Sequence, residues 1–253
     1  MSSFEILCIS WNQDMGCFAV GTQAGFIVYN TDPLKERFRR DCGSVGIIEL
    51  LFKTNILAFV GGGTKPRYSP RQVMLWDDYQ NKVIGELEFR SNVLAVKMKR
   101  DRLIITLENK IYAYNFADLT LLFQAETTNN PLGLSCVSLE KHYLACLGLQ
   151  VGSIHVENFE QRDRYSIVAH NSPIQALTMS SDGSVMATVS TKGTLIRIFD
   201  VKSGKKIREL RRGMEQALIT NLCFDYSGKH LLVFSDKGTV HLYSVQGENR
   251  SSS

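Results

Sequence analysis

Short apolar or alternating runs, separated by turn residues, follow one another along most of the chain. Almost none of them has the spacing of an amphipathic helix, whereas alternation over a few residues is typical of a half-buried strand. The runs come in groups of four, and the pattern therefore predicts an all-β chain of small antiparallel sheets. The first three groups cover residues 6–10, 17–21, 25–30 and 34–39, then 47–52, 56–60, 73–76 and 82–89, then 93–99, 103–107, 111–115 and 119–125.

The later groups repeat one another closely. Residues 188–199 read TVSTKGTLIRIF and residues 233–243 read VFSDKGTVHLY. Aromatic residues in the third strands recur at multiples of roughly 40–45 residues, the period of one WD-type propeller blade. They are Tyr29, Trp76, Tyr114, Phe199 and Tyr243.

A four-stranded blade cannot bury both of its faces alone, so neighbouring blades must stack. The pattern predicts one β-propeller domain over residues 1–245, with about five full four-stranded blades and a partial sixth. Propellers of this type often close at about seven blades, so the predicted number is short of a usual ring. The polar residues 246–253 are predicted to be a disordered tail.

Composition changes this picture little. The net charge of +4 is modest and does not by itself indicate nucleic acid. The six cysteines form no Cys-x-x-Cys pair, which favours reduced, buried thiols. No signal peptide and no bilayer-spanning run is expected, so membrane contact would be peripheral and the protein cytoplasmic.

Catalytic and metal-binding patterns are not evident. The chain has no phosphate-binding glycine loop, no nucleophile elbow and no His/Cys ligand spacing among its five histidines. The pair Asp77 and Asp78 follows Trp76 at a strand end, where a turn cap is the simpler interpretation. We therefore expect no enzyme activity, no metal and no cofactor.

Residues 202–213 carry six cations against one carboxylate, Glu209. A solvated outer strand is the ordinary interpretation of such a run. However, adjacent side chains on a strand point in opposite directions, so Arg211 and Arg212 are predicted to serve two different pockets. Gly213 is expected to let the chain turn away without a Cβ blocking either pocket.

Each arginine has hydroxyl-rich segments as expected neighbours. Hydroxyls, a histidine and a guanidinium fork are donors that suit a phosphate monoester, although Ser and Thr are also plain strand formers. Arg211 is predicted to face Ser190, Thr191, Lys192, Thr194 and Arg197, with His170 near the start of the same blade. Arg212 is predicted to face Ser235, Lys237, Thr239 and His241.

A second pair of arginines, Arg39 and Arg40, occupies an outer strand of the first blade. Asp41 stands where the other pair has a glycine, and the nearby residues 21–26 lack the Ser/Thr-Lys/His set. We interpret this pair as a surface cluster whose charge is satisfied by Asp41 or Glu36.

The sequence LRRG at 210–213, together with the strand pairs on either side, resembles the PROPPINs, seven-bladed propellers that bind phosphatidylinositol 3-phosphate and phosphatidylinositol 3,5-bisphosphate in autophagy and endolysosomal traffic. The segments NQD at 12–14, GGG at 61–63 and VMLWDD at 73–78 resemble the branch that holds the WD-repeat-45 type proteins. The family motif often begins with Phe, so Leu210 is a conservative departure.

The resemblance implies two lipid pockets. The first falls on His170, Ser190, Thr191, Thr194, Arg197 and Arg211. The second falls on Arg212, Ser235, Lys237, Thr239 and His241. In the same branch an autophagy lipid-transfer protein docks on the surface that corresponds to Asn12 and Asp14.

One family feature is missing from the expected place. The family inserts an apolar loop of the sixth blade into the bilayer, and here that loop would start after Val245, where only the polar residues 246–253 follow.

The resemblance implies a monomeric, non-enzymatic reader of phosphoinositide headgroups, recruited to preautophagosomal, endosomal or vacuolar membranes. The alternative is a WD-repeat scaffold for proteins without specific lipid recognition. Nucleic acid is not expected as a partner, because the basic strand lacks interleaved aromatic residues.

Overall fold

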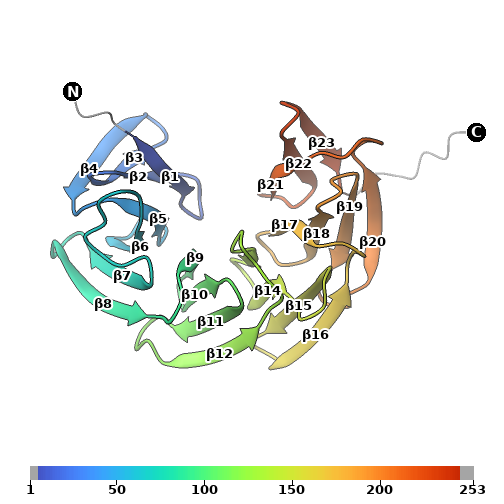
Figure 1. Ribbon diagram of the computed structural model, residues 1–253, viewed down its shortest axis with the longest axis horizontal. Coiled ribbons are helices and arrows are strands. Elements are labelled where there is room, and N and C mark those ends of the chain that lie inside the picture. Colours follow the sequence, from blue (N-terminus) through green and yellow to red (C-terminus); the bar gives the residue numbers. More distant parts are fainter. Residues whose placement is uncertain (1–4, 246–253) are drawn as a thin grey trace, which may run out of the picture. The chain divides into compact units, whose positions relative to one another are not determined.

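The computed structural model describes residues 5–245, and within them it contains strands and turns but no helix. The strands form six antiparallel sheets, each a simple meander in chain order; five have four strands and the last has three (Figure 1). The prediction of an all-β propeller with five full blades and a partial sixth is confirmed. The tail 246–253, and with it the position of the family's apolar loop, lies outside the described residues.

The chain divides into two compact units, Met1–Ala125 and Glu126–Ser253, which are described separately. The first unit holds three sheets. Their strands are β1 Ile6–Trp11, β2 Cys17–Thr22, β3 Gly25–Asn30 and β4 Lys35–Asp41; β5 Val45–Leu50, β6 Ile56–Gly61, β7 Gln72–Asp77 and β8 Lys82–Glu88; and β9 Val93–Lys99, β10 Arg102–Leu107, β11 Lys110–Asn115 and β12 Leu121–Glu126.

The second unit holds the other three sheets. Their strands are β13 Ser135–Val137, β14 Tyr143–Leu147, β15 Ser153–Asn158 and β16 Asp163–Val168; β17 Ile174–Met179, β18 Val185–Ser190, β19 Leu195–Asp200 and β20 Lys206–Arg211; and β21 Ile219–Phe224, β22 His230–Ser235 and β23 Val240–Ser244.

Sheets within a unit stack through their first strands and their apolar faces. In the first unit β1 lies against β5 and β5 against β9, and in the second unit β13 lies against β17 and β17 against β21. Buried side chains fill the space between neighbouring sheets, as Met186 and Phe199 do against Ile154 and Val156 in the second unit. Neighbouring sheets therefore bury the faces that a single four-stranded blade could not bury alone, as predicted.

Strand ends differ from the predicted ones where the backbone turns. The predicted strand over 47–52 is β5, which ends at Leu50, because Phe52 has a left-handed φ of 51° that a strand cannot contain. The predicted start at Leu34 is also wrong, since β4 begins at Lys35 and the Leu34 side chain is exposed.

The six cysteines form no disulfide. Cys17, Cys42 and Cys146 are buried, and burial raises the pKa of the Cys146 thiol to about 12. The expectation of reduced thiols that pack as small apolar groups agrees with this arrangement for the buried three.

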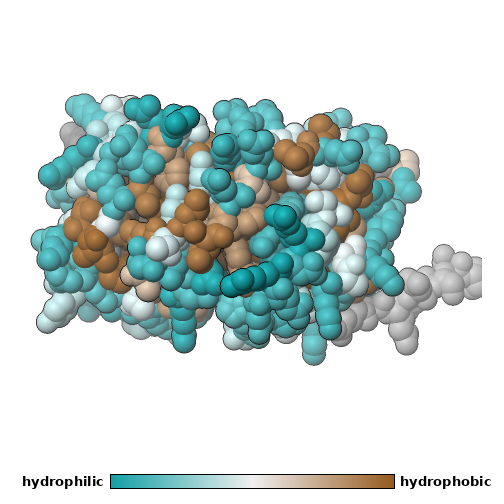
Figure 2. Space-filling model, turned by 90° about the horizontal axis from the view of Figure 1, so that it is seen from below, coloured by the Kyte–Doolittle hydropathy of each residue, from teal (hydrophilic) through white to brown (hydrophobic). Residues whose placement is uncertain are grey.

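Hydrophilic side chains predominate on the face of the molecule in Figure 2, where hydrophobic ones form separate patches. Outer strands expose some apolar groups, including Leu121 and Leu122 on β12 and Ile207 on β20. Such scattered exposure is normal for a folded surface.

Candidate anion-binding site

The paired arginines stand at the end of the outer strand β20. Leu210 is buried in the core between the fifth and sixth sheets, whereas the Arg211 side chain is exposed. Arg212 follows the last residue of the strand, and its backbone N–H donates to the Thr194 carbonyl at 2.9 Å. The motif thus marks the point where the chain leaves the fifth sheet.

Strand register places Arg211 and Arg197 on one face of the fifth sheet. Arg211 lies opposite Leu195 on β19, and Glu209 lies opposite Arg197. Phe199, on the same face of β19, packs in the core shared with the fourth sheet. This face therefore points toward the sheet β13–β16.

The polar groups on this face form what we call the first cluster: His170, Thr188, Arg197, Lys206, Glu209 and Arg211. Arg197 donates from Nε to Oε2 of Glu209 at 2.8 Å and from Nη1 to the Ala169 carbonyl at 2.6 Å. Lys206 Nζ lies 3.1 Å from the same Glu209 oxygen. Among the described residues, the Arg211 guanidinium has no hydrogen bond or ion pair, so it is a free donor beside two committed cations.

His170 is buried and belongs to the same cluster. Its Nε2 lies 3.0 Å from the Thr188 hydroxyl. Burial, with the positive charge of Arg197 as a second cause, lowers the pKa of His170 to about 4. The ring is therefore neutral at physiological pH and offers the site a hydrogen bond but no charge.

The predicted hydroxyls cluster at the β18–β19 turn. Ser190 is buried and its carbonyl accepts from the Gly193 N–H, while the Thr191 N–H donates to the Pro173 carbonyl. Thr194 offers its carbonyl to Arg212. The turn thus holds Ser190, Thr191 and Thr194 at the end of the sheet where Arg211 stands, and Lys192 is exposed there.

Arg212 is used differently from Arg211. Its Nε donates to the Gly193 carbonyl at 2.6 Å, and its Nη2 donates to the Glu215 carbonyl. Its positive charge also opposes the rise in pKa that burial causes at Tyr243, on the sixth sheet. Arg212 therefore lies near the sixth sheet, but its guanidinium donates to backbone carbonyls around it.

Three of the expected partners of Arg212 share one face of the sixth sheet, and together with Lys237 in the adjoining turn we call them the second cluster: Ser235, Lys237, Thr239 and His241. The Ser235 and Thr239 hydroxyls are 3.1 Å apart, and the His241 ring stacks on Tyr243 with centroids 6.1 Å apart. Val233 and Leu231, opposite His241 and Tyr243, pack against the fifth sheet. No hydrogen bond joins Arg212 to the second cluster within residues 5–245, and Lys237 is exposed in the β22–β23 turn.

The backbone at Gly213 does not itself require a glycine, and the expectation that a Cβ there would block a pocket stays a prediction. A Cβ at this position would meet nothing within 4 Å, and its backbone is outside the left-handed region. The glycine that this region requires is Gly193, whose φ is +64° and whose added Cβ would lie 1.8 Å from the Ala217 carbonyl oxygen.

The other double arginine is neutralised within the protein. Arg39 pairs with Glu36 at 2.6 Å, as predicted, and Arg40 pairs with Asp78 at 2.8 Å rather than with Asp41. The Arg40 guanidinium also lies over the Phe38 ring, 5.1 Å from its centroid. Both guanidinium groups are thus committed, unlike that of Arg211.

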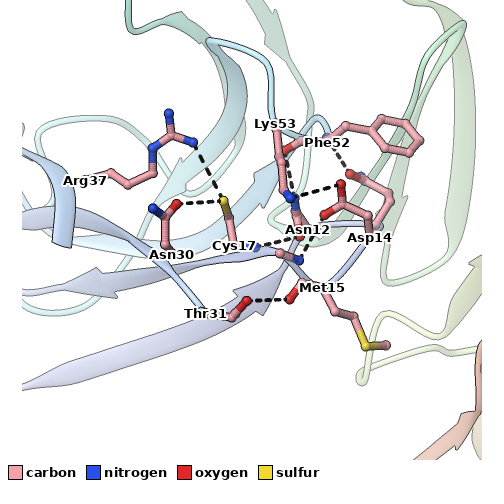
Figure 3. A network of polar contacts seen from close by, with 11 residues as sticks. Asn12, Asp14, Met15, Cys17, Asn30, Thr31, Arg37, Phe52 and Lys53 are labelled. Carbon is pink, nitrogen blue, oxygen red and sulfur yellow. Dashed lines mark hydrogen bonds and ion pairs between the residues drawn. The ribbon is translucent and has the colours of Figure 1, made fainter. Parts of the chain in front are cut away.

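Asn12 and Asp14, the predicted docking residues, have unlike positions at the β1–β2 turn (Figure 3). Asn12 is 2% exposed; its amide donates to the Phe52 carbonyl at 3.1 Å and its Oδ1 accepts from the Cys17 N–H at 3.0 Å. The prediction that Asn12 is an outer docking contact is therefore corrected: this side chain is buried and stabilises the turn. Asp14 is exposed and lies 3.9 Å from Lys53 Nζ.

The described residues contain no group of three or more His, Cys, Asp or Glu side chains that could hold a metal ion. The part of the chain that the structure describes also has no helix of the length and apolarity that a bilayer crossing needs.

Comparison with known proteins gives concordant matches. The family model described as PROPPIN matches residues 5–252. Autophagy-related protein 18e of Arabidopsis thaliana is 40% identical over 251 residues, which cover 97% of this chain and 67% of that protein. SVP1-like protein 2 of Neurospora crassa is 37% identical over 242 residues, 95% of this chain and 56% of that protein.

The fold has a counterpart among solved structures. Kluyveromyces lactis Hsv2 with its complete loop 6CD has a TM-score of 0.85 at 26% identity, over 97% of this chain and 75% of that chain. This chain therefore spans only part of the length of the proteins that it matches.

Proposed function

Because this chain belongs to the PROPPIN family, we propose that it binds phosphatidylinositol 3-phosphate and phosphatidylinositol 3,5-bisphosphate through the first and second clusters. The observation that carries the proposal is the exposed, unpartnered Arg211 guanidinium beside Arg197 and the hydroxyls of the β18–β19 turn. A guanidinium with free N–H groups binds phosphate oxygens as a fork. The role is non-enzymatic: a scaffold recruited to phosphoinositide-marked membranes in autophagy and endolysosomal traffic.

The second cluster supports a second headgroup. Ser235, Thr239 and His241 present hydroxyl and ring N–H groups on the sheet face beside Arg212. Two weak sites on one rigid body raise the overall affinity for a membrane without new contacts. A headgroup at this second site would compete for the Arg212 donors that now bind the Gly193 and Glu215 carbonyls.

The test is the double variant Arg211→Thr with Arg212→Thr, in cosedimentation with vesicles that contain phosphatidylinositol 3-phosphate. Binding should fall to the level of vesicles without phosphoinositide. The matched control is Arg39→Thr with Arg40→Thr, which removes the same charge from another outer strand and should leave binding in place. Undiminished binding of the Arg211/Arg212 variant would refute the proposal.

The alternative function is a protein-interaction scaffold without specific lipid recognition. The exposed Asp14 at the β1–β2 turn is where we propose that an acidic contact with an autophagy lipid-transfer protein would form. This alternative would be favoured if the Arg211/Arg212 variant captured a protein partner as well as the wild type does and the wild type showed no preference among phosphoinositides at moderate salt.

A further inference from the structure

Glu209 is the carboxylate at the centre of the first cluster, and neither of the lipid pockets that the family resemblance implies includes it. We infer that Glu209 limits the first cluster to one phosphate monoester, and so makes it favour monophosphorylated over bisphosphorylated inositol headgroups. This inference rests on the proposed function, because it concerns the selectivity of the same site.

The backbone brings two cations onto Glu209. Arg197 is directly opposite on β19. Lys206 is three residues away on β20, and strict alternation would place it on the other face of the sheet. The register shifts between Ile198 and Phe199, so that Lys206 lies opposite Phe199 on the same face as Glu209. This bulge allows Lys206 Nζ and Arg197 Nε to bind the same carboxylate oxygen.

The charge of the cluster matches a single phosphate monoester. Arg197, Lys206 and Arg211 supply three positive charges and Glu209 supplies one negative charge, which leaves a net charge of +2. Hydrogen bonds from Arg197 and Lys206 lower the pKa of Glu209, which keeps it ionised, and His170 is neutral. A phosphate monoester carries about −1.5 to −2 at neutral pH. One such group neutralises the cluster, and a second would meet the Glu209 carboxylate.

The donors are divided in the same way. Arg197 spends Nε on Glu209 and Nη1 on the Ala169 carbonyl, whereas Arg211 has its whole fork available. The first phosphate therefore binds at Arg211. Arg197 Nε and one N–H of Lys206, which could otherwise bind a second phosphate, are held by Glu209.

A simpler interpretation is that Glu209 belongs to an ordinary exposed ion pair on an outer strand. Such pairs contribute little to stability, and this carboxylate side chain is 36% exposed. That interpretation predicts no change in headgroup preference when the carboxylate is removed, so the two interpretations can be separated by experiment.

The experiment compares the whole chain with Glu209→Gln and with Glu160→Gln. Glu160 is an exposed carboxylate in the β15–β16 turn of the same unit, and its loss changes the net charge equally. Each protein is cosedimented with vesicles that contain either phosphatidylinositol 3-phosphate or phosphatidylinositol 3,5-bisphosphate. Glu209→Gln should strengthen binding of the bisphosphate roughly two- to five-fold, the scale of one exposed ion pair, and change the monophosphate less. Glu160→Gln should keep the wild-type ratio.

A second measurement titrates the soluble headgroups inositol 1,3-bisphosphate and inositol 1,3,5-trisphosphate, which lack the lipid. The same change in ratio should appear, and Glu209→Gln combined with Arg211→Thr should abolish it. A change seen only with vesicles, an equal gain for both headgroups, a loss of binding or an equal effect of Glu160→Gln would each overturn the inference. Wild-type protein that binds neither lipid would refute the proposed function itself.

Discussion

The Tyr243 hydroxyl, on β23, donates a hydrogen bond of 3.2 Å to the backbone carbonyl of Arg211, the last residue of β20. The third strand of the sixth sheet thereby holds the end of the outer strand of the fifth. The backbone of the arginine motif is thus linked to Tyr243, on which the His241 ring of the second cluster stacks.

Tyr243→Phe should lower the free energy of unfolding by about 0.5–1.5 kcal/mol, because the Arg211 carbonyl loses one hydrogen bond. Tyr226→Phe is the matched control, since Tyr226 is 80% exposed and should change stability by less than about 0.5 kcal/mol. Urea unfolding of both variants measures the difference. Equal effects would show that the Tyr243 hydroxyl does not stabilise this junction.

The two motif arginines should differ in their effect on stability. Arg212→Thr removes donors from the Gly193 and Glu215 carbonyls and should cost about 1 kcal/mol, whereas Arg211→Thr should cost less than about 0.5 kcal/mol. Both should weaken binding to phosphatidylinositol 3-phosphate vesicles. Urea unfolding beside cosedimentation separates the two properties, and a larger stability loss for Arg211→Thr would contradict this assignment.

Glycine substitutions should separate the turn from the motif. Gly193→Ala places a Cβ against the Ala217 carbonyl in a left-handed backbone and should destabilise by more than about 1 kcal/mol. Gly213→Ala has open space and should change stability by no more than about 1 kcal/mol, toward greater stability if at all. Thermal unfolding of the two variants measures this difference in stability. A Gly213→Ala protein that is as destabilised as Gly193→Ala would contradict the prediction.

His170 should give the protein a stability loss in mild acid. The unfolded chain takes up the proton near pH 6.5 and the folded protein only near pH 4. The free energy of unfolding should therefore fall as pH drops through this window, by up to about 3 kcal/mol, and level off below it. His170→Gln should lack this component, so its stability difference from wild type should shrink toward acid pH in urea titrations. A difference that stays constant from pH 7 to pH 4 would rule out a neutral buried ring.

Asn12 and Asp14 should act by different routes. Asn12→Ala leaves the Phe52 carbonyl and the Cys17 N–H without their partner and should cost about 1–3 kcal/mol. Asp14→Ala should cost less than about 0.5 kcal/mol. Thermal unfolding and partner capture, measured together, would distinguish a lost contact at Asp14 from a disturbed turn at Asn12. An Asn12→Ala protein as stable as wild type would contradict the buried role.

The strand pattern could be read from the sequence because alternation and turn residues are local properties. The same alternation predicts that Arg211 shares a face with Arg197, as the β19–β20 register has it. The ion pair between Lys206 and Glu209 could not be foreseen, because it depends on a register shift near Ile207 that leaves no mark in the residue types.

The burial of single polar residues could not be predicted from the sequence either. Asn12 and Asp14 are two positions apart in a polar turn, and only the packing of the Phe52 backbone against that turn makes one of them interior. Thr188, the hydroxyl that contacts His170, was missed for a similar reason: within an apolar strand it looks like an ordinary strand former.

The three-stranded sixth sheet has a chemical consequence of its own. Every other sheet carries a fourth, outer strand, whereas β23 has a strand neighbour on one side only among the described residues. The Ser244 carbonyl on the other side accepts from Arg208, while the main-chain N–H and C=O groups of Val240 and Leu242, whose side chains are exposed, form a short template for an incoming antiparallel segment. An unpaired strand with apolar side chains also promotes edge-to-edge aggregation. Solubility at high concentration therefore depends on whether a further segment pairs with that strand.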